Sequence, residues 1–249
     1  MADPLHQFVI EPIVPLEIGG LDLSFTNSSL WMMIAVGTSF VLFSQAMKRK
    51  ALVPGRLQVL VEIFYQMVAD MVRSTIGPEG RKYFPFVFTI FMLVLMGNLL
   101  GLIPGAFTYT SHIIVTAALA LLVFFTVVGI AIAKHGLHFF TLFAPAGVPW
   151  FVYPLLVPIE IVSYMARPIT HGLRLFANML AGHILLKVFA SFSVGLVASM
   201  GVVGFAAGLI PAGINTVLIG FELLIALLQA YVFAILTCMY LKDTVEIGH

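Results

Sequence analysis

Charged residues are scarce in this sequence. Lysine, arginine, aspartate and glutamate make up 9% of its 249 residues, whereas hydrophobic residues make up 61%, and the mean hydropathy is +1.10. A soluble domain has roughly a quarter of its residues charged, so this composition excludes one and indicates a protein that lies in lipid. A formal net charge of +1 without a basic cluster also excludes nucleic acid as a partner.

Cysteine and N-terminal basic residues are also lacking. The single cysteine, Cys238, excludes an internal disulfide, and its apolar neighbours indicate a small buried side chain. The first 29 residues contain no lysine or arginine, unlike a cleaved signal peptide, so we predict a retained tail. The sequence has no phosphate-binding loop and no metal-ligand pattern. We therefore expect no cofactor, no metal and no directly bound nucleotide.

Long uncharged apolar stretches predict membrane-crossing helices, because about 20 such residues cross the ~30 Å of hydrocarbon. Basic residues follow the first stretch and precede the second, which places these ends in the cytoplasm and the N-terminus in the periplasm. Between them, an apolar stripe with polar residues opposite predicts an amphipathic helix on the membrane surface. The predicted segments are a periplasmic tail (1–29), a first span (30–47), the surface helix (57–75), a second span (83–103) and a third span (112–133).

The last 110 or so residues predict a different arrangement. Four prolines predict an irregular connector over residues 139–158. Two helical segments follow, 159–190 and 212–241, separated by a glycine-rich bend before Pro211. A helix of about 30 residues reaches ~45 Å, so both must tilt, as an antiparallel hairpin. The predicted fold class is thus an all-α membrane protein in one membrane domain, with five membrane-crossing helices, one surface helix and a cytoplasmic C-terminus.

Several ionisable residues lie within this predicted hairpin. Each costs at least ~2.5 to 3.5 kcal/mol at membrane depth, so the group indicates function. In an antiparallel pair, residues at equal depth have a nearly constant sum of sequence numbers, which puts Arg174 beside Gln229 and His183 beside Glu222. The amide of Gln229 can accept a hydrogen bond from Arg174 without neutralising its charge. An imidazole and a carboxylate can relay a proton.

Helical geometry adds a constraint on this relay. His183 lies nine residues beyond Arg174, which is about 13 Å along the helix and a turn of about 180°. His183 therefore faces away from Arg174 and Asn178. We expect the proton to enter from the periplasmic side and to pass beside the helix.

Structural roles remain open for each of these residues. Arg174 and Glu222 could form a buried ion pair that only satisfies both charges. His183 could be an interior histidine without a proton role. Asn178 and Gln229 could be amides that bridge two helices.

Three sequence motifs resemble the signature of subunit a of F-type ATP synthases. They are His171–His183 (HGLRLFANMLAGH), Leu227–Phe233 (LLQAYVF) and Gly97–Pro104 (GNLLGLIP), in the family's order along most of the chain. In some bacterial members of the family, an acid occupies the position of His183 and a histidine occupies the position of Glu222. The exchanged form is similar to that of mitochondria and their bacterial relatives.

The resemblance implies a stator subunit that is not catalytic alone. It would load and unload the carboxylate of the rotor c-ring through two offset half-channels, next to peripheral-stalk b-type subunits and lipid in a bacterial inner membrane. Arg174 takes the place of the family's essential arginine, which separates the half-channels. The implied proton relay is His183, Glu222, Asn178 and Gln229.

The cytoplasmic half-channel is assigned by the same resemblance. Glu160, Ser163 and Arg167 match positions at the family's cytoplasmic end. Glu160 and Lys187 lie near the ends of their predicted helix, so either side chain could instead extend to the interface.

Two rival functions use similar residues. A secondary proton-coupled transporter also has intramembrane Arg, His and Glu residues, but it usually shows a repeated half, and none is visible. An intramembrane hydrolase needs a nucleophile next to a base. Ser163 and His171 are eight residues apart and form no recognised motif.

Overall fold

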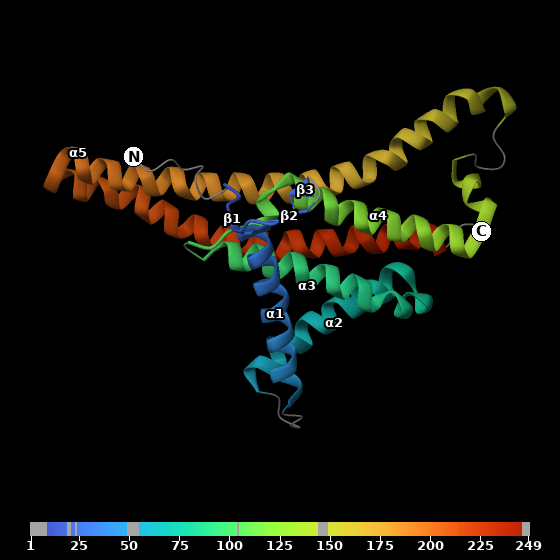
Figure 1. The fold of residues 1–249 in the computed structure, drawn as a ribbon, viewed down its shortest axis with the longest axis horizontal. Coiled ribbons are helices and arrows are strands. Elements are labelled where there is room, and N and C mark those ends of the chain that lie inside the picture. The colour runs from blue at the N-terminus through green and yellow to red at the C-terminus, as the bar shows by residue number, and fades with distance from the viewer. Residues whose placement is uncertain are drawn as a thin grey trace.

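The computed structural model describes residues 9–18, 21–22, 24–48, 55–103, 105–143 and 149–245. Most of this part of the chain is helical, and four of its helices are long and apolar enough to cross a membrane (Figure 1). The α-helices are α1 (Asn27–Lys48), α2 (Arg56–Ile76), α3 (Phe84–Gly101), α4 (Ile113–His135) and α5 (Tyr153–Val245). Among the described residues, 3₁₀ segments lie between α2 and α3, between α3 and α4, and between α4 and α5: η2 (Pro78–Lys82), η3 (Tyr109–Ser111), η4 (Gly136–Phe143) and η5 (Trp150–Val152).

Four of the α-helices occupy segments that the sequence predicts as helical. Helices α1, α3 and α4 cover the first, second and third predicted spans, and α2 covers the predicted surface helix, with ends that differ by at most three residues. The N-terminal segment contains short strands that the sequence analysis did not predict. Strand β1 (Pro12–Val14) pairs antiparallel with β4 (Phe25–Thr26), and β2 (Glu17–Ile18) pairs with β3 (Leu21–Asp22).

The hairpin is longer than predicted, and its bend is sharper. Helix α5 has 93 residues with a single non-helical residue, Gly201, at φ 58° and ψ −127°. Glycine adopts such angles without the steric cost that a side chain brings. Pro211, where the sequence predicted the end of a broad bend, lies inside the second half of the helix.

The proline-rich connector is correspondingly shorter than predicted. Helix α5 begins at Tyr153, so the last six residues of the predicted connector are helical. Pro154 is tolerated because the first turn of a helix needs no N–H donor. Each half of α5 is about 45 residues, or about 68 Å, which is far more than a bilayer's hydrocarbon requires.

The two halves of α5 lie side by side and antiparallel, and α3 and α4 run along them (Figure 1). Helix α1 crosses this layer steeply, so α1 and α5 cannot both stand upright in one bilayer. Helix α3 lies at the centre, and Val87, Phe91, Val94 and Leu95 on it are completely buried. Helix α1 is more exposed, with Phe40 73% accessible.

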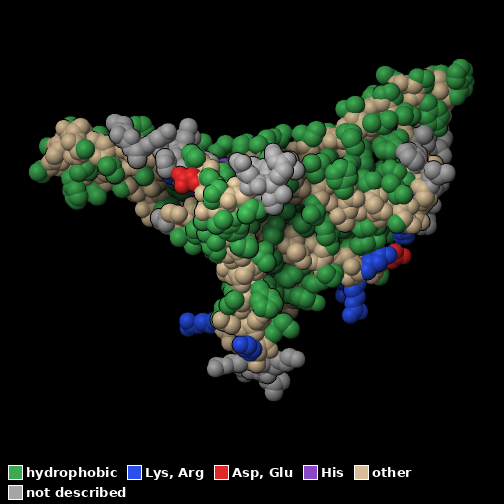
Figure 2. All heavy atoms as spheres, in the orientation of Figure 1, with side chains coloured by type: hydrophobic (Ala, Val, Ile, Leu, Met, Phe, Trp, Pro, Cys, Tyr) green, Lys and Arg blue, Asp and Glu red, His purple; other side chains and the backbone are tan. Residues whose placement is uncertain are grey.

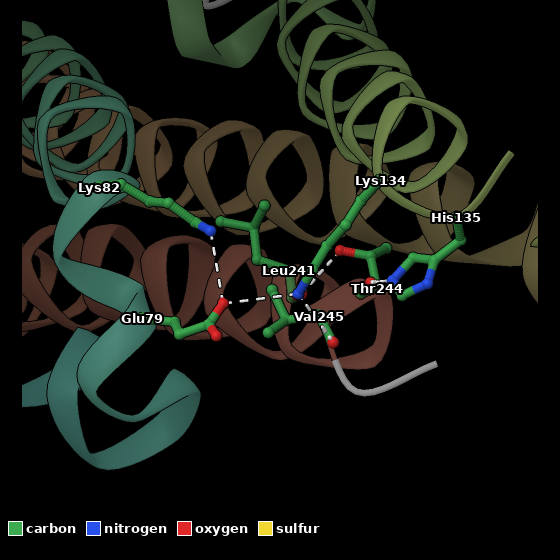
Figure 3. A network of polar contacts seen from close by, with 7 residues as sticks. All are labelled: Glu79, Lys82, Lys134, His135, Leu241, Thr244 and Val245. Atoms are coloured by element: carbon green, nitrogen blue, oxygen red, sulfur yellow. Dashed lines mark hydrogen bonds and ion pairs between the residues drawn. The ribbon is translucent and has the colours of Figure 1, made fainter. Parts of the chain in front are cut away.

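A polar cluster joins the ends of η2, α4 and α5 (Figure 3). Lys134 Nζ donates to Glu79 Oε2 at 3.4 Å and to the carbonyl of Val245 at 3.2 Å. His135 Nε2 donates to the carbonyl of Thr244 at 2.9 Å. Cations at a helix C-terminus interact favourably with its dipole, so α4 anchors the end of α5.

This cluster is charged at neutral pH. A hydrogen bond from Lys82, together with the charge of Lys134, lowers the pKa of Glu79 below its ordinary value. Both Lys82 and Glu79 have more than half of their side-chain surface accessible. The cluster therefore belongs at an aqueous or headgroup surface.

Gly97 on α3 allows the loop before α4 to pack closely. A Cβ atom at this position would collide with the hydroxyl of Tyr109. Tyr109 is 1% exposed, and its Oη donates to the carbonyl of Leu93 at 2.8 Å, so its ring has no room to move.

We predict that Gly97→Ala destabilises the subunit by about 1–3 kcal/mol, the usual cost of overpacking a core. The measurement is the thermal stability of the purified complex, followed through retention of this subunit. Gly129→Ala on α4 is the matched control, because no described atom other than the neighbouring backbone of its own helix lies within 4 Å of a Cβ placed there. Equal stability of the two variants would contradict the packing argument.

Candidate functional site

The centre of the site is a histidine and a carboxylate from opposite halves of α5. His183 Nδ1 lies 3.5 Å from Glu222 Oε1. The two residues are only 6% and 3% exposed. The level pairing predicted for these two residues is therefore found in the structure, and it arises because the chain reverses at Gly201.

Thr108, in the loop before α4, contacts the imidazole nitrogen of His183 other than the one near Glu222. His183 Nε2 lies 3.1 Å from Thr108 Oγ1, and that hydroxyl donates to the carbonyl of Gly101 at 3.2 Å. When the single hydrogen of the hydroxyl is on the Gly101 carbonyl, the hydroxyl accepts from Nε2–H of the corresponding tautomer. Nδ1, which faces Glu222, is then the nitrogen that gains or loses a proton.

Glu222 is held against the backbone of the first half of α5. A Cβ at Gly182 would lie 2.7 Å from Glu222 Oε1 and 3.1 Å from its Cδ. The carboxylate can hold a proton and donate it to Nδ1 of His183, or it can be ionised beside an imidazolium. At 3.5 Å the pair has no hydrogen bond, and neither oxygen of Glu222 has a hydrogen-bond partner among the described atoms. A small approach of the two side chains or one bridging water is therefore needed for a proton to move between them.

The amide of Gln229 has a different partner from the one predicted. Asn178 Nδ2 donates to Gln229 Oε1 at 2.8 Å, where the sequence placed Arg174 beside Gln229. Asn178 is one turn further along the helix than Arg174. Pairing residues by the sum of their sequence numbers cannot distinguish positions one turn apart when the two helices cross at an angle. The amide pair bridges the two halves.

Arg174 lies on another side of the helix from His183. Arg174 and Asn178 are exposed and His183 is buried, in agreement with the half-turn rotation between them. Among the described residues, no ion pair joins Arg174 to Glu222, whose carboxylate faces His183 instead. The guanidinium is therefore available to an outside partner.

The opposite end of the hairpin carries an ion pair that the sequence analysis missed. Arg167 Nη1 lies 2.8 Å from Asp243 Oδ2. The guanidinium also lies over the rings of Tyr164 and Tyr240, at 5.0 and 5.4 Å from their centroids. Asp243 follows the apolar stretch near the end of α5. An acid in that place ordinarily indicates only that the helix end is exposed to solvent.

Glu160 and Ser163 lie on the first half of α5, before Arg167. Ser163 is exposed and Glu160 is half-buried. Ser163 lies four residues and Glu160 seven residues before Arg167, so all three side chains lie on one side of the helix.

A cavity of about 590 Å³ lies next to the buried pair. Its polar lining includes Glu11, Asn27, His183, Lys187 and Asn215. Glu11, Asn27 and Asn215 were not predicted as site residues, because they come from three separate segments that meet only around this cavity and leave no periodic signal in the sequence. Among the described residues, no group of three or more His, Cys, Asp or Glu could hold a metal ion.

Asn98 on α3 supports the second half of α5. It is completely buried, and its Nδ2 donates to the carbonyl of Ala226 at 3.3 Å. It lies in the Gly97–Pro104 motif, although the sequence analysis gave it no role. The signal in the sequence that could have identified Asn98 is its amide side chain within an apolar stretch.

Fold and site together define a multi-pass α-helical membrane protein with a histidine and a carboxylate buried side by side between two long antiparallel helices. Residues 28–242 match the ATP synthase A chain family. The chain therefore belongs to the ATP synthase subunit a family.

Similar proteins cover the whole chain. ATP synthase subunit a of Nitrobacter winogradskyi is 54% identical over 250 residues, which is 100% of both chains. That of Parvibaculum lavamentivorans is 52% identical over 99% of this chain and 95% of its own. That of Bradyrhizobium diazoefficiens is 53% identical over 99% of each.

We predict that Gly182→Ala lowers ATP-driven proton pumping by about tenfold or more, because the new methyl group displaces the Glu222 carboxylate, and misplacing a reacting group by about 1 Å can cost 10²-fold. Pumping is measured in inverted membrane vesicles as the quench of a pH-sensitive dye. Gly195→Ala is the control on the same helix, since a Cβ there would have no described atom within 4 Å except the neighbouring backbone of α5. Normal pumping by Gly182→Ala would refute the positioning of Glu222.

Proposed function

We propose that this stator subunit carries protons through two offset half-channels, which load and unload the carboxylate of the rotor c-ring. Membership of the family makes the chain a proton-translocating stator subunit and a component of the ATP synthase complex. The buried contact between His183 and Glu222 is the observation that carries the inlet. Proton flow would thereby drive rotation and ATP synthesis elsewhere in the complex.

The inlet begins at the cavity beside His183. A proton from this cavity reaches the imidazole, whose Nδ1 passes it to Glu222 while Nε2 stays bound to Thr108. Glu222 then releases the proton toward the rotor carboxylate. The amide pair of Asn178 and Gln229 lies farther along the hairpin and supports a polar path between the two halves.

Arg174 would separate the two half-channels. Its permanent charge attracts an ionised rotor carboxylate and repels a proton or hydronium that takes a direct route. The exposed position of Arg174 supports contact with a partner, as do large exposed apolar side chains on both halves of α5. These include Leu173, Val217, Phe221, Leu224 and Leu228.

The outlet would pass Glu160 and Ser163 on the other side of Arg174. Lys82, Lys134 and the rest of the polar cluster support a cytoplasmic location for that end, because positive charge collects on that side. The N-terminus would then be periplasmic and the C-terminus cytoplasmic, with α1, α3, α4 and the two halves of α5 as five crossing helices.

The surroundings follow from this topology. We place the chain in a bacterial inner membrane, in contact with lipid, the c-ring and b-type subunits of the peripheral stalk. Helix α2, with its apolar stripe, would lie along the membrane surface.

We predict that Arg174→Ala abolishes coupled proton pumping while passive proton conduction is retained or increased, because the barrier between the half-channels is a charge. The whole complex is reconstituted in vesicles, and both ATP-driven acidification and proton leak under an imposed gradient are recorded.

Arg56→Ala, at the start of α2, removes an arginine outside α5 and is expected to leave both readings unchanged. If Arg174→Ala pumped normally, Arg174 would not be the separator, and most of the proposed path would be lost with it.

A further inference from the structure

The cavity beside His183 has an acidic residue on its outer rim. Glu11 lies in the N-terminal segment and is exposed, as is Val9, whereas His183 is buried at the inner end. The cavity therefore runs from an accessible rim to the proposed relay. Figure 2 shows that charged side chains are few on the face of the molecule in view.

Asn27, the first residue of α1, holds Glu11 at that rim through three hydrogen bonds. The backbone N–H of Glu11 donates to Asn27 Oδ1 at 3.3 Å, and the backbone N–H of Asn27 donates to the carbonyl of Glu11 at 3.1 Å. Asn27 Nδ2 also donates to the carbonyl of Val9 at 3.0 Å. The segment is thus attached to the top of α1 instead of extending freely into solvent.

The interior of the cavity is suited to water. Asn215 Oδ1 is buried there and has no hydrogen-bond partner among the described atoms. A volume of about 590 Å³ is many times that of one water molecule. A water chain can therefore connect Glu11 to His183.

The charged and titratable groups that line the cavity come from two places. Lys187 and His183 come from the first half of α5, and Glu11 comes from the N-terminal segment. The described lining from α1, from the second half of α5 and from the loop after α3 is uncharged. Glu11 is consequently the one acid on a lining that otherwise carries a cation and an imidazole.

We propose that Glu11 is the proton-collecting carboxylate of the inlet. Its ionised carboxylate takes a proton from the aqueous phase, releases it to water in the cavity, and is ionised again for the next proton. A negative group at the mouth of a cleft raises the local concentration of cations and offsets the positive charge of Lys187. This role rests on the proposed inlet through His183 and Glu222.

The test is made on the whole complex, reconstituted with its catalytic part outside so that the proposed periplasmic side faces the lumen. The initial rate of ATP synthesis is measured against luminal pH at a fixed membrane potential. For Glu11→Gln we expect a roughly two- to fivefold lower rate at the most alkaline luminal pH, where proton capture limits the rate, and full rate at acidic pH. Glu11→Asp keeps the carboxylate and should follow the wild-type curve.

Glu62→Gln makes the same chemical change on α2, away from the cavity, and controls for loss of one acid. A Glu11→Gln curve that coincides with the wild-type curve would overturn the proposal. A curve lowered equally at every pH would also overturn it, since that result indicates a structural role. Glu222→Gln tests the proposed inlet independently of Glu11. If the complex with Glu222→Gln still synthesised ATP at the normal rate, protons would not enter through His183 and Glu222.

Discussion

The reversal of the chain at Gly201 is the constraint on which the rest of the structure depends. It makes one apolar stretch into two antiparallel helices and brings His183 to Glu222 and Asn178 to Gln229. Ionisable groups are costly in lipid. Each of these side chains instead faces a polar side chain on the other half, so the hairpin brings the polar groups of the site together inside the protein.

The other helices keep this hairpin in register. Asn98 on α3 binds the second half, and Thr108 beyond α3 orients the imidazole on the first. At the far end, Lys134 and His135 bind the last carbonyls of α5. These contacts come from separate elements, so the position of His183 beside Glu222 depends on packing across much of the chain.

Close packing at glycine recurs where the polar groups meet. Gly101 leaves space for the side chain of Thr108, and Gly182 leaves space for the carboxylate of Glu222. In each case the missing side chain lets a polar group approach a backbone. Helix association in membranes relies on such small residues, because lipid supplies no hydrophobic force between helices.

The sequence by itself determined the helical membrane class, the helices α1 to α4 and the level pairing of His183 with Glu222. These depend on hydropathy, on charge and on the constant rise of a helix, which are local properties. Only the tertiary structure decided the single-residue turn at Gly201, the partner of Gln229, the contact of His183 with Thr108 and the place of Glu11 beside the cavity. These features depend on how side chains from distant segments pack together, with a precision finer than one helical turn. No periodicity in the sequence contains that information.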